Sequence, residues 1–128
     1  MQKPPFSAVA LTFAGALPFL AAALDIPLPG LPRGVVLAER YGLIIGCFMA
    51  GCHWGFAARR GAAHWYALSV VAPLVILFTG PSLGLLAGVF AGLLVLDGAF
   101  QWAGLAPGWW LTLRVPVSAL VITTLVVL

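Results

Sequence analysis

The sequence contains very little charge. Asp, Glu, Lys and Arg make up 7% of its 128 residues, whereas 63% are hydrophobic, and soluble domains carry about 25% charged residues. The six Lys and Arg residues are too few for a surface that neutralises a run of nucleic-acid phosphates. The composition therefore predicts an integral membrane protein that contacts the lipid bilayer and does not bind nucleic acid.

Cysteine and histidine are scarce as well, at two residues each. Cys47 and Cys52 lie on one expected helix, about 140° apart around its axis, so we expect neither a disulfide nor a shared metal between them. His53 and His64 are expected at different depths, which disfavours heme ligation. The chain also lacks paired carboxylates and the spacings of Ser/His/Asp or metal-ligand sites. We therefore expect no cofactor, no metal site and no enzymatic reaction.

Long hydrophobic runs are what the sequence has in quantity. Five segments approach the ~20 apolar residues that cross a ~30 Å hydrocarbon core: Phe6–Leu24, Glu39–Ala58, Ala62–Thr79, Ser82–Gln101 and Trp109–Leu128. The links are short, except for the loop Asp25–Gly34, whose three prolines forbid a regular helix. We predict one all-α integral membrane domain over residues 1–128, a bundle of five transmembrane helices with short hairpin loops and one Pro-rich loop.

Two expectations concern the ends of these segments. The first run follows Lys3 and ends in small residues, so a secretory signal peptide stays open as an alternative to a retained helix. Glu39 and Arg40 are expected to open the second helix, where an acid suits the helix dipole, and Arg40 is long enough to reach Asp25 or the interface.

The basic residues predict an orientation. With five spans, Lys3, Arg59, Arg60 and Arg114 fall on the N-terminal side, and Arg33 and Arg40 fall on the other. By the positive-inside rule, the N-terminus lies in the cytoplasm, or in the matrix of a mitochondrion, and the C-terminus lies outside. The tryptophans are expected near the N-terminal face as an interfacial belt: Trp54, Trp65, Trp102, Trp109 and Trp110.

Three polar side chains fall in one layer of three different expected helices. At ~1.5 Å per residue, His53 lies about 9 Å inside the interface, and Asp97 and Arg114 lie about 7.5 Å inside it. Ionisable groups at such depths are costly and usually pair inside the bundle. We expect Asp97 and Arg114 to tie the fourth helix to the fifth, with His53 donating to Asp97 or to a carbonyl. A proton-relay or binding role is the alternative, and a heme or metal role is less favoured.

Small residues form stripes on two of the expected helices. The second helix carries Gly42 and Gly46 on one face and Gly51 and Gly55 on an adjacent face, and the fourth carries Gly84, Gly88 and Gly92. Such stripes let helices approach closely in lipid. They predict a close contact between the second and fourth helices, although glycine is also simply frequent in membrane helices.

Two motifs resemble a known family. The segment Tyr41–Gly55, "YGLIIGCFMAGCHWG", and the segment Leu93–Arg114, "LLVLDGAFQWAGLAPGWWLTLR", are similar to the small membrane proteins grouped as domain of unknown function 3429, related to eukaryotic transmembrane protein 69. The positions that match the family pattern are Tyr41, Gly42, Phe48, Gly51, His53, Trp54, Gly55, Asp97, Trp109, Leu113 and Arg114. Ala50, Cys47 and Trp110 depart from the glycine, serine and tyrosine expected there. The resemblance implies a multi-span protein of the bacterial inner membrane, or of the mitochondrial inner membrane in a eukaryote, and supplies no activity.

Three classes of function remain. We favour a non-enzymatic accessory or assembly component that packs against other membrane protein subunits or against itself, because the chain offers little extramembrane surface. A small transporter, channel or proton path through the layer of His53, Asp97 and Arg114 is the alternative, and an enzyme ranks last. The sparse polar residues between this layer and the outer end weigh against a through-path.

Overall fold

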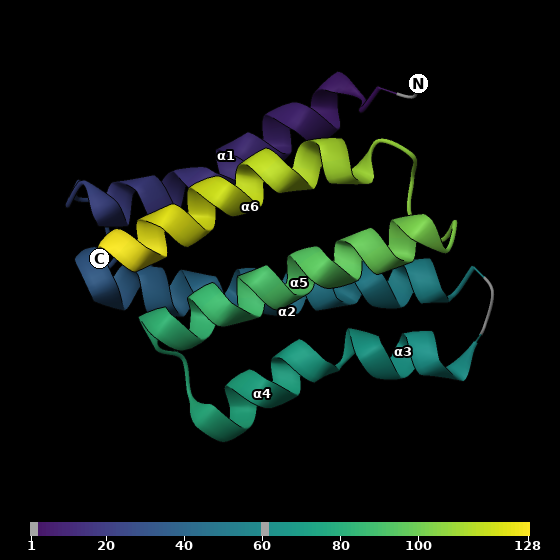
Figure 1. The fold of residues 1–128 in the computed structure, drawn as a ribbon. Coiled ribbons are helices and arrows are strands. Elements are labelled where there is room, and N and C mark those ends of the chain that lie inside the picture. The colour runs from purple at the N-terminus through teal and green to yellow at the C-terminus, as the bar shows by residue number, and fades with distance from the viewer. Residues whose placement is uncertain (1–2, 60–61) are drawn as a thin grey trace.

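The regular structure of the chain is helical (Figure 1). The computed structural model describes residues 3–59 and 62–128, and in these residues the elements are α1 (Phe6–Ala23), α2 (Gly34–Ala57), α3 (Ala63–Ser69), α4 (Val71–Thr79), α5 (Leu83–Trp102) and α6 (Trp110–Val127). Helices α1, α2, α5 and α6 are long and apolar enough to cross a membrane, by length and composition. The predicted all-α class with membrane-capable helices is therefore confirmed, and the count of five such helices is not.

The third predicted span, 62–79, is divided into two helices that meet at Val70. The hydroxyl of Ser69 donates to the carbonyl oxygen of Tyr66 at 2.6 Å, and Pro73 has no N–H with which to reach the carbonyl of Ser69. A side chain that competes for a backbone acceptor, followed by a missing donor, interrupts the helical ladder here. Pro18 and Pro116 lie within continuous helices, so proline alone does not explain the break.

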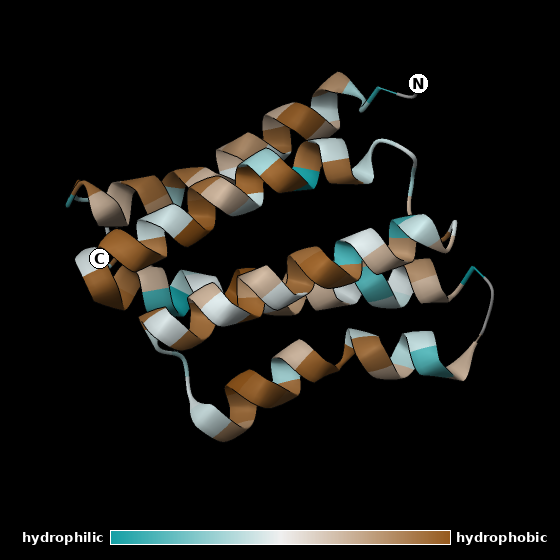
Figure 2. Cartoon of the chain, viewed as in Figure 1, coloured by the Kyte–Doolittle hydropathy of each residue, from teal (hydrophilic) through white to brown (hydrophobic). Residues whose placement is uncertain are grey.

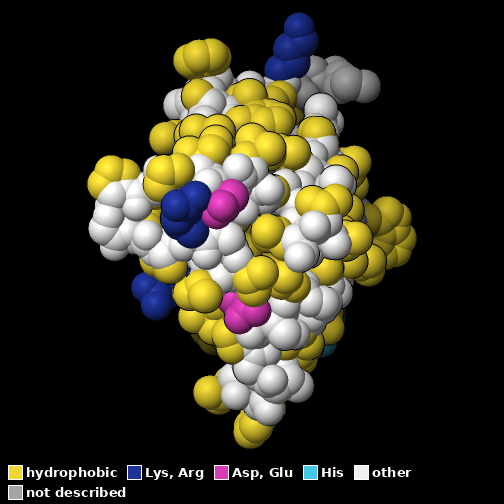
Figure 3. Space-filling view, turned by 90° about the vertical axis from the view of Figure 1, so that its left-hand side faces the viewer, with side chains coloured by type: hydrophobic (Ala, Val, Ile, Leu, Met, Phe, Trp, Pro, Cys, Tyr) yellow, Lys and Arg dark blue, Asp and Glu magenta, His cyan; other side chains and the backbone are white. Residues whose placement is uncertain are grey.

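Helix α2 begins five residues earlier than predicted, at Gly34 rather than Glu39. The apolar residues before Glu39 continue the helix, so Glu39 does not cap it. The expected contact of Arg40 with Asp25 is replaced by Arg33, whose Nη2 lies 3.0 Å from Oδ2 of Asp25 and whose Nε donates to Oδ1 at 3.2 Å. Figure 3 views this end of the bundle, where charged side chains lie on a largely hydrophobic surface. The pair is exposed, so it stabilises the loop only weakly.

Helices α1, α2, α5 and α6 form the bundle, and the short helices α3 and α4 flank it. Helix α5 packs against α2 and α6, α1 packs against α2 and α6, and α3 and α4 lie outside, against α2 (Figure 1). Helices α1 and α6 run in one direction along the bundle, and α2 and α5 run in the opposite direction (Figure 1). The C-terminal ends of α2 and α5 therefore lie at the same end of the bundle as the N-terminus, and the C-terminus of the chain lies at the other end.

The bundle is hydrophobic both inside and outside. Its main core contains Phe19, Leu86, Phe90, Leu93 and Leu125, and a second cluster surrounds Phe100 near the ends of α2 and α5. Hydrophobic residues recur along all of the helices (Figure 2), and large apolar side chains such as those of Phe6, Phe78 and Trp102 are exposed. Helices that are apolar on all sides are typical of a bundle whose outer surface meets lipid.

Candidate functional site

Three helices meet at a buried carboxylate. Asp97 on α5 is 0% exposed, and α2 and α6 bring His53 and Arg114 to it from either side. Nε2 of His53 lies 2.7 Å from Oδ1 of Asp97, and Nε of Arg114 donates to Oδ2 at 2.9 Å. The structure thus brings together the three residues of the polar layer expected from depth.

The carboxylate accepts a further hydrogen bond that the sequence analysis did not anticipate. The indole Nε1 of Trp110 donates to Oδ1 of Asp97 at 2.8 Å. An ionised carboxylate only accepts hydrogen bonds, so Nε2 of His53 is the donor in that pair. Three donors therefore converge on Asp97, and donors to a charged group make stronger hydrogen bonds than neutral pairs. We call His53, Asp97, Trp110 and Arg114 the polar cluster.

Two contacts fix the orientation of the His53 imidazole ring: a hydrogen bond from a ring nitrogen and a stacking contact on the ring face. It stacks on Phe100 with ring centroids 4.9 Å apart and an angle of 7° between the planes, and it is completely buried. Its second nitrogen, Nδ1, has no hydrogen-bond partner among the residues that the structure describes. The ring is therefore oriented by its hydrogen bond to Asp97 and its stacking on Phe100, and Phe56 lies beside it with ring centroids 6.3 Å apart.

The connection between α5 and α6 fixes the relative position of Asp97 and Trp110. Oε1 of Gln101 accepts a hydrogen bond from the backbone N–H of Leu111 at 2.7 Å, and Nε2 of Gln101 donates to the carbonyl of Gly108 at 3.2 Å. Nη1 of Arg59 donates to the carbonyl of Leu105 at 3.0 Å, which ties the end of α2 to the same loop. Neither Gln101 nor Arg59 was expected to have this role, because such contacts depend on the path of the loop.

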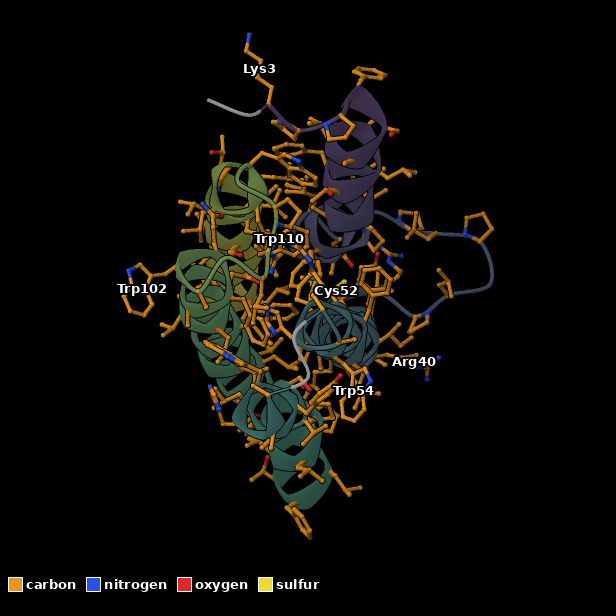
Figure 4. The ribbon with its side chains drawn as sticks, turned by 90° about the vertical axis from the view of Figure 1, so that its right-hand side faces the viewer. Lys3, Arg40, Cys52, Trp54, Trp102 and Trp110 are labelled. Atoms are coloured by element: carbon orange, nitrogen blue, oxygen red, sulfur yellow. The ribbon has the colours of Figure 1, made fainter. Side chains whose placement is uncertain are left out.

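The five tryptophans do not share one environment. Trp102 is 90% exposed and points away from the bundle, whereas Trp110 lies among the helices (Figure 4). Trp54 is half-exposed and packs edge to face on Tyr66, and Trp65 packs against Phe100. Trp109 lies beside Trp110, with ring centroids 6.0 Å apart. Trp110 was expected only as part of an interfacial belt, and its indole N–H also donates to Asp97.

The glycines divide into contact positions and open positions. A Cβ atom on Gly42 would lie 2.7 Å from Cδ1 of Leu86, and one on Gly46 would lie 3.3 Å from Cδ1 of Ile76. A Cβ atom would meet nothing within 4 Å in the described residues at the other stripe positions, Gly51, Gly55, Gly84, Gly88 and Gly92. Helices α2 and α5 do pack together, but through Gly42 and not through the stripe of α5.

The stripe of α5 faces away from α2 for a simple geometric reason. Leu86, Phe90 and Leu93 are the buried positions of α5, and Gly88 is two residues from both Leu86 and Phe90. At ~100° per residue, two residues turn the helix by about 200°, which places Gly88 on nearly the opposite face. The predicted close contact between the second and fourth expected helices therefore occurs, as α2 against α5, but the glycine stripe of α5 does not make it.

Two hollows adjoin these features. One, of about 310 Å³, lies among α1, α2 and α6, and both Arg114 and Ser118 line it. The other, of about 600 Å³, is a groove along α5 that is closed on one side by α3 and α4. Its lining includes Gly84, Gly88 and Gly92. Within the described residues, no group of three or more His, Cys, Asp or Glu side chains is placed to hold a metal ion.

Comparisons with known proteins give one match. A family described as "Protein of unknown function (DUF3429)" has a model that matches residues 4–128, nearly the whole chain. No curated protein and no solved structure matches the chain.

Proposed function

Because the chain belongs to the DUF3429 family, whose description assigns no activity, we propose its function from geometry: it is a non-enzymatic accessory or assembly protein that binds a transmembrane helix of another membrane protein. One observation carries this proposal. The groove along α5 presents a stripe of three glycines that no part of the chain's described residues covers.

The groove has the character of a helix-binding surface. Its lining residues are all apolar or glycine, and they come from α5 on one side and from α3 and α4 on the other. In lipid there is little hydrophobic drive between helices, so association depends on close backbone approach over small residues. Gly84, Gly88 and Gly92 provide that approach over two turns of α5.

A different protein suits the groove better than a second copy of this chain. A two-fold dimer places the same patch of both copies face to face, so the patch must be self-complementary. Two concave grooves placed together would leave a void, whereas a single helix fills one groove. The absence of charged side chains from the lining predicts that the bound face of the partner helix is apolar.

The proposal includes a topology. Helix α2 ends at the N-terminal end of the bundle and α5 begins at the other end (Figure 1), so α3 and α4 together carry the chain back across. We propose five crossings of the bacterial inner membrane, or of the mitochondrial inner membrane in a eukaryote, with the N-terminus in the cytoplasm or matrix. The larger number of Lys and Arg residues assigned to the N-terminal side, four against two in the sequence, supports this orientation.

Photo-crosslinking in native membranes tests the helix-binding role. A photoreactive side chain at Val95, which is exposed and lines the groove, should give an adduct with another membrane protein. The matched control is Ile44, which is exposed on α2 and lines neither hollow. Gly88→Leu should abolish the adduct from Val95 while the isolated protein keeps its thermal stability. An adduct of two copies of the chain, or the same adduct from both positions, would overturn the proposal.

A proton path or small transporter is the second candidate. Its support is the set of buried polar atoms without a partner in the described residues: Nδ1 of His53, Nη2 of Arg114 and Oγ of Ser118. Ser118 and Thr124 continue from Arg114 along the buried face of α6, but the hydroxyl of Thr124 is taken by the carbonyl of Val121 at 2.7 Å. Purified protein in liposomes distinguishes the candidates, because a path predicts proton or solute flux that His53→Leu removes.

A further inference from the structure

The hollow of about 310 Å³ among α1, α2 and α6 is distinct from the groove along α5. Its size falls at the lower end of the ~300–1,000 Å³ typical of small-molecule sites. Most of its lining is aliphatic or aromatic, including Phe19, Phe90 and Trp110. A site of this kind binds an apolar body and orients it through a few polar groups.

Two of the lining residues carry buried polar atoms that have no hydrogen-bond partner among the described residues. Nη2 of Arg114 and Oγ of Ser118 are buried, and neither has a hydrogen-bond partner among the described residues. Arg114 is 5% exposed and Ser118 is 1% exposed, and the two lie one turn apart on α6. A buried donor without an acceptor is costly, and the two residues that carry these donors line the same hollow.

The charge of the neighbouring groups restricts what fills that space. Nε of Arg114 already donates to the carboxylate of Asp97, so the positive charge of Arg114 is compensated. Asp97 also receives hydrogen bonds from the neutral indole of Trp110 and from His53. An additional anion would be a buried charge without a counter-ion, which is unfavourable. A neutral oxygen with two lone pairs accepts from both free donors without that cost.

The entrance to the hollow indicates where the ligand comes from. Leu11 on α1 and Phe48 on α2 both line the hollow, and they are 74% and 65% exposed. In a membrane, exposed apolar side chains in the middle of long helices meet lipid. A ligand therefore enters sideways from the bilayer, between α1 and α2.

We propose that this hollow is a binding site for a neutral, lipid-soluble molecule whose carbonyl oxygen accepts hydrogen bonds from Arg114 and Ser118. Two sources share this chemistry: an ester of a fatty acid and a quinone with an alkyl tail. The site is separate from the groove proposed to bind a helix, so either proposal stands if the other fails.

Fluorescence quenching of the full-length protein in detergent tests the site, because Trp110 lines the hollow. The probes are a brominated fatty-acid methyl ester and a short-tailed benzoquinone, each of which quenches tryptophan on contact. We expect saturable quenching by at least one probe, and the one that saturates identifies the source. A brominated alkane and the brominated free acid of equal length serve as controls, and both should bind more weakly than the ester.

Two variants of α6 separate binding from folding. Ser118→Ala removes one donor and should weaken probe binding about three- to tenfold, the value of one hydrogen bond, while the stability of the ligand-free protein stays equal or rises. Thr124→Val is the matched control, since Thr124 is buried on the same helix and does not line the hollow, and it should leave binding unchanged. The absence of saturable quenching by both carbonyl probes would overturn the proposal. Equal affinity of Ser118→Ala and the unchanged protein, or tighter binding of the free acid, would also overturn it.

Discussion

The indole N–H of Trp110 and the imidazole of His53 both converge on one oxygen of Asp97. Nε1 of Trp110 lies 2.8 Å from Oδ1 of Asp97, and Nε2 of His53 lies 2.7 Å from the same atom. The other oxygen, Oδ2, faces Arg114 at 2.9 Å. The buried carboxylate is therefore stabilised by the cation of Arg114 and by two further donors, one from α2 and one from α6.

Trp110→Phe tests how much the indole donor contributes. Phenylalanine keeps an aromatic ring beside Phe56, which packs edge to face on Trp110, but it removes the hydrogen bond to a charged acceptor. We expect the free energy of unfolding to fall by about 1.5–3 kcal/mol, measured as thermal stability in detergent. Trp102→Phe is the control, because Trp102 is exposed and should tolerate the change. Equal effects at the two positions would mean that the contact with Asp97 contributes nothing.

Asp97 and Arg114 should behave as a coupled pair. Asp97→Asn leaves the guanidinium of Arg114 buried without a counter-ion, and Arg114→Gln leaves the carboxylate with its neutral donors only. Each single change should cost about 3–5 kcal/mol, reduced if water reaches the site, and the double change should cost less than the sum of the two. A double-mutant cycle of thermal stabilities measures this coupling. Simple additivity would show that the two charges do not stabilise each other.

The loss of stability on replacing His53 should depend on whether the new side chain keeps a hydrogen-bond donor. His53→Gln keeps an N–H that can reach Asp97, although it loses the stacking on Phe100. His53→Leu removes the donor entirely and should be more destabilising, by about 1–3 kcal/mol for an unsatisfied buried partner. The comparison uses the same unfolding assay for both variants. If both variants are as stable as the unchanged protein and only cellular function is lost, His53 has a functional role such as proton transfer and not a structural one.

The common depth of His53, Asp97 and Arg114 could be predicted from the sequence because it rests on two general facts. Helical rise converts residue counts into depth, and charged groups buried in a membrane bundle seek partners. Trp110 was missed because a tryptophan near a helix end suits both the interface and the bundle interior. Its position one turn before Arg114 on the inward face of α6 was the available signal, and only the α5–α6 loop geometry decides between the two.

Two features that hydropathy does not report caused the errors in the fold. They are the rotation of a helix about its axis and the competition of side chains for backbone hydrogen bonds. The glycine stripe on α5 was assigned to the α2 contact by its composition, although Leu86 and Phe90 occupy the inward face. The division between α3 and α4 depends on Ser69 competing for a backbone carbonyl. Length and hydrophobicity predicted the four long helices, because these two properties identify segments that are able to cross a bilayer.

The topology is tested by reporter fusions at the two ends of the bundle. A reporter after Leu128 and a reporter inserted in the α4–α5 link at Pro81 should both lie outside the cytoplasm, since both sites are at the end opposite to Lys3. A reporter inserted after Ala103, in the α5–α6 loop, should lie inside and serves as the control. A cytoplasmic signal from the fusion after Leu128 would contradict the proposed orientation.

Replacing the two kinds of glycine by alanine should change the stability of the protein in opposite directions. Gly42→Ala places a Cβ atom 2.7 Å from Cδ1 of Leu86, and Leu86 is itself completely buried, so either the Leu86 side chain must repack within the core or α2 and α5 must shift apart. Overpacking of this kind costs about 1–3 kcal/mol, more than the gain of about 0.5–1 kcal/mol from replacing glycine within a helix. Gly88→Ala meets no neighbouring atom and should keep that gain, so the isolated protein should become slightly more stable. Thermal unfolding of both variants in the same detergent decides the matter, because a loss of stability at Gly88 equal to that at Gly42 would mean that the stripe of α5 is packed within the chain and is not free to bind a partner helix.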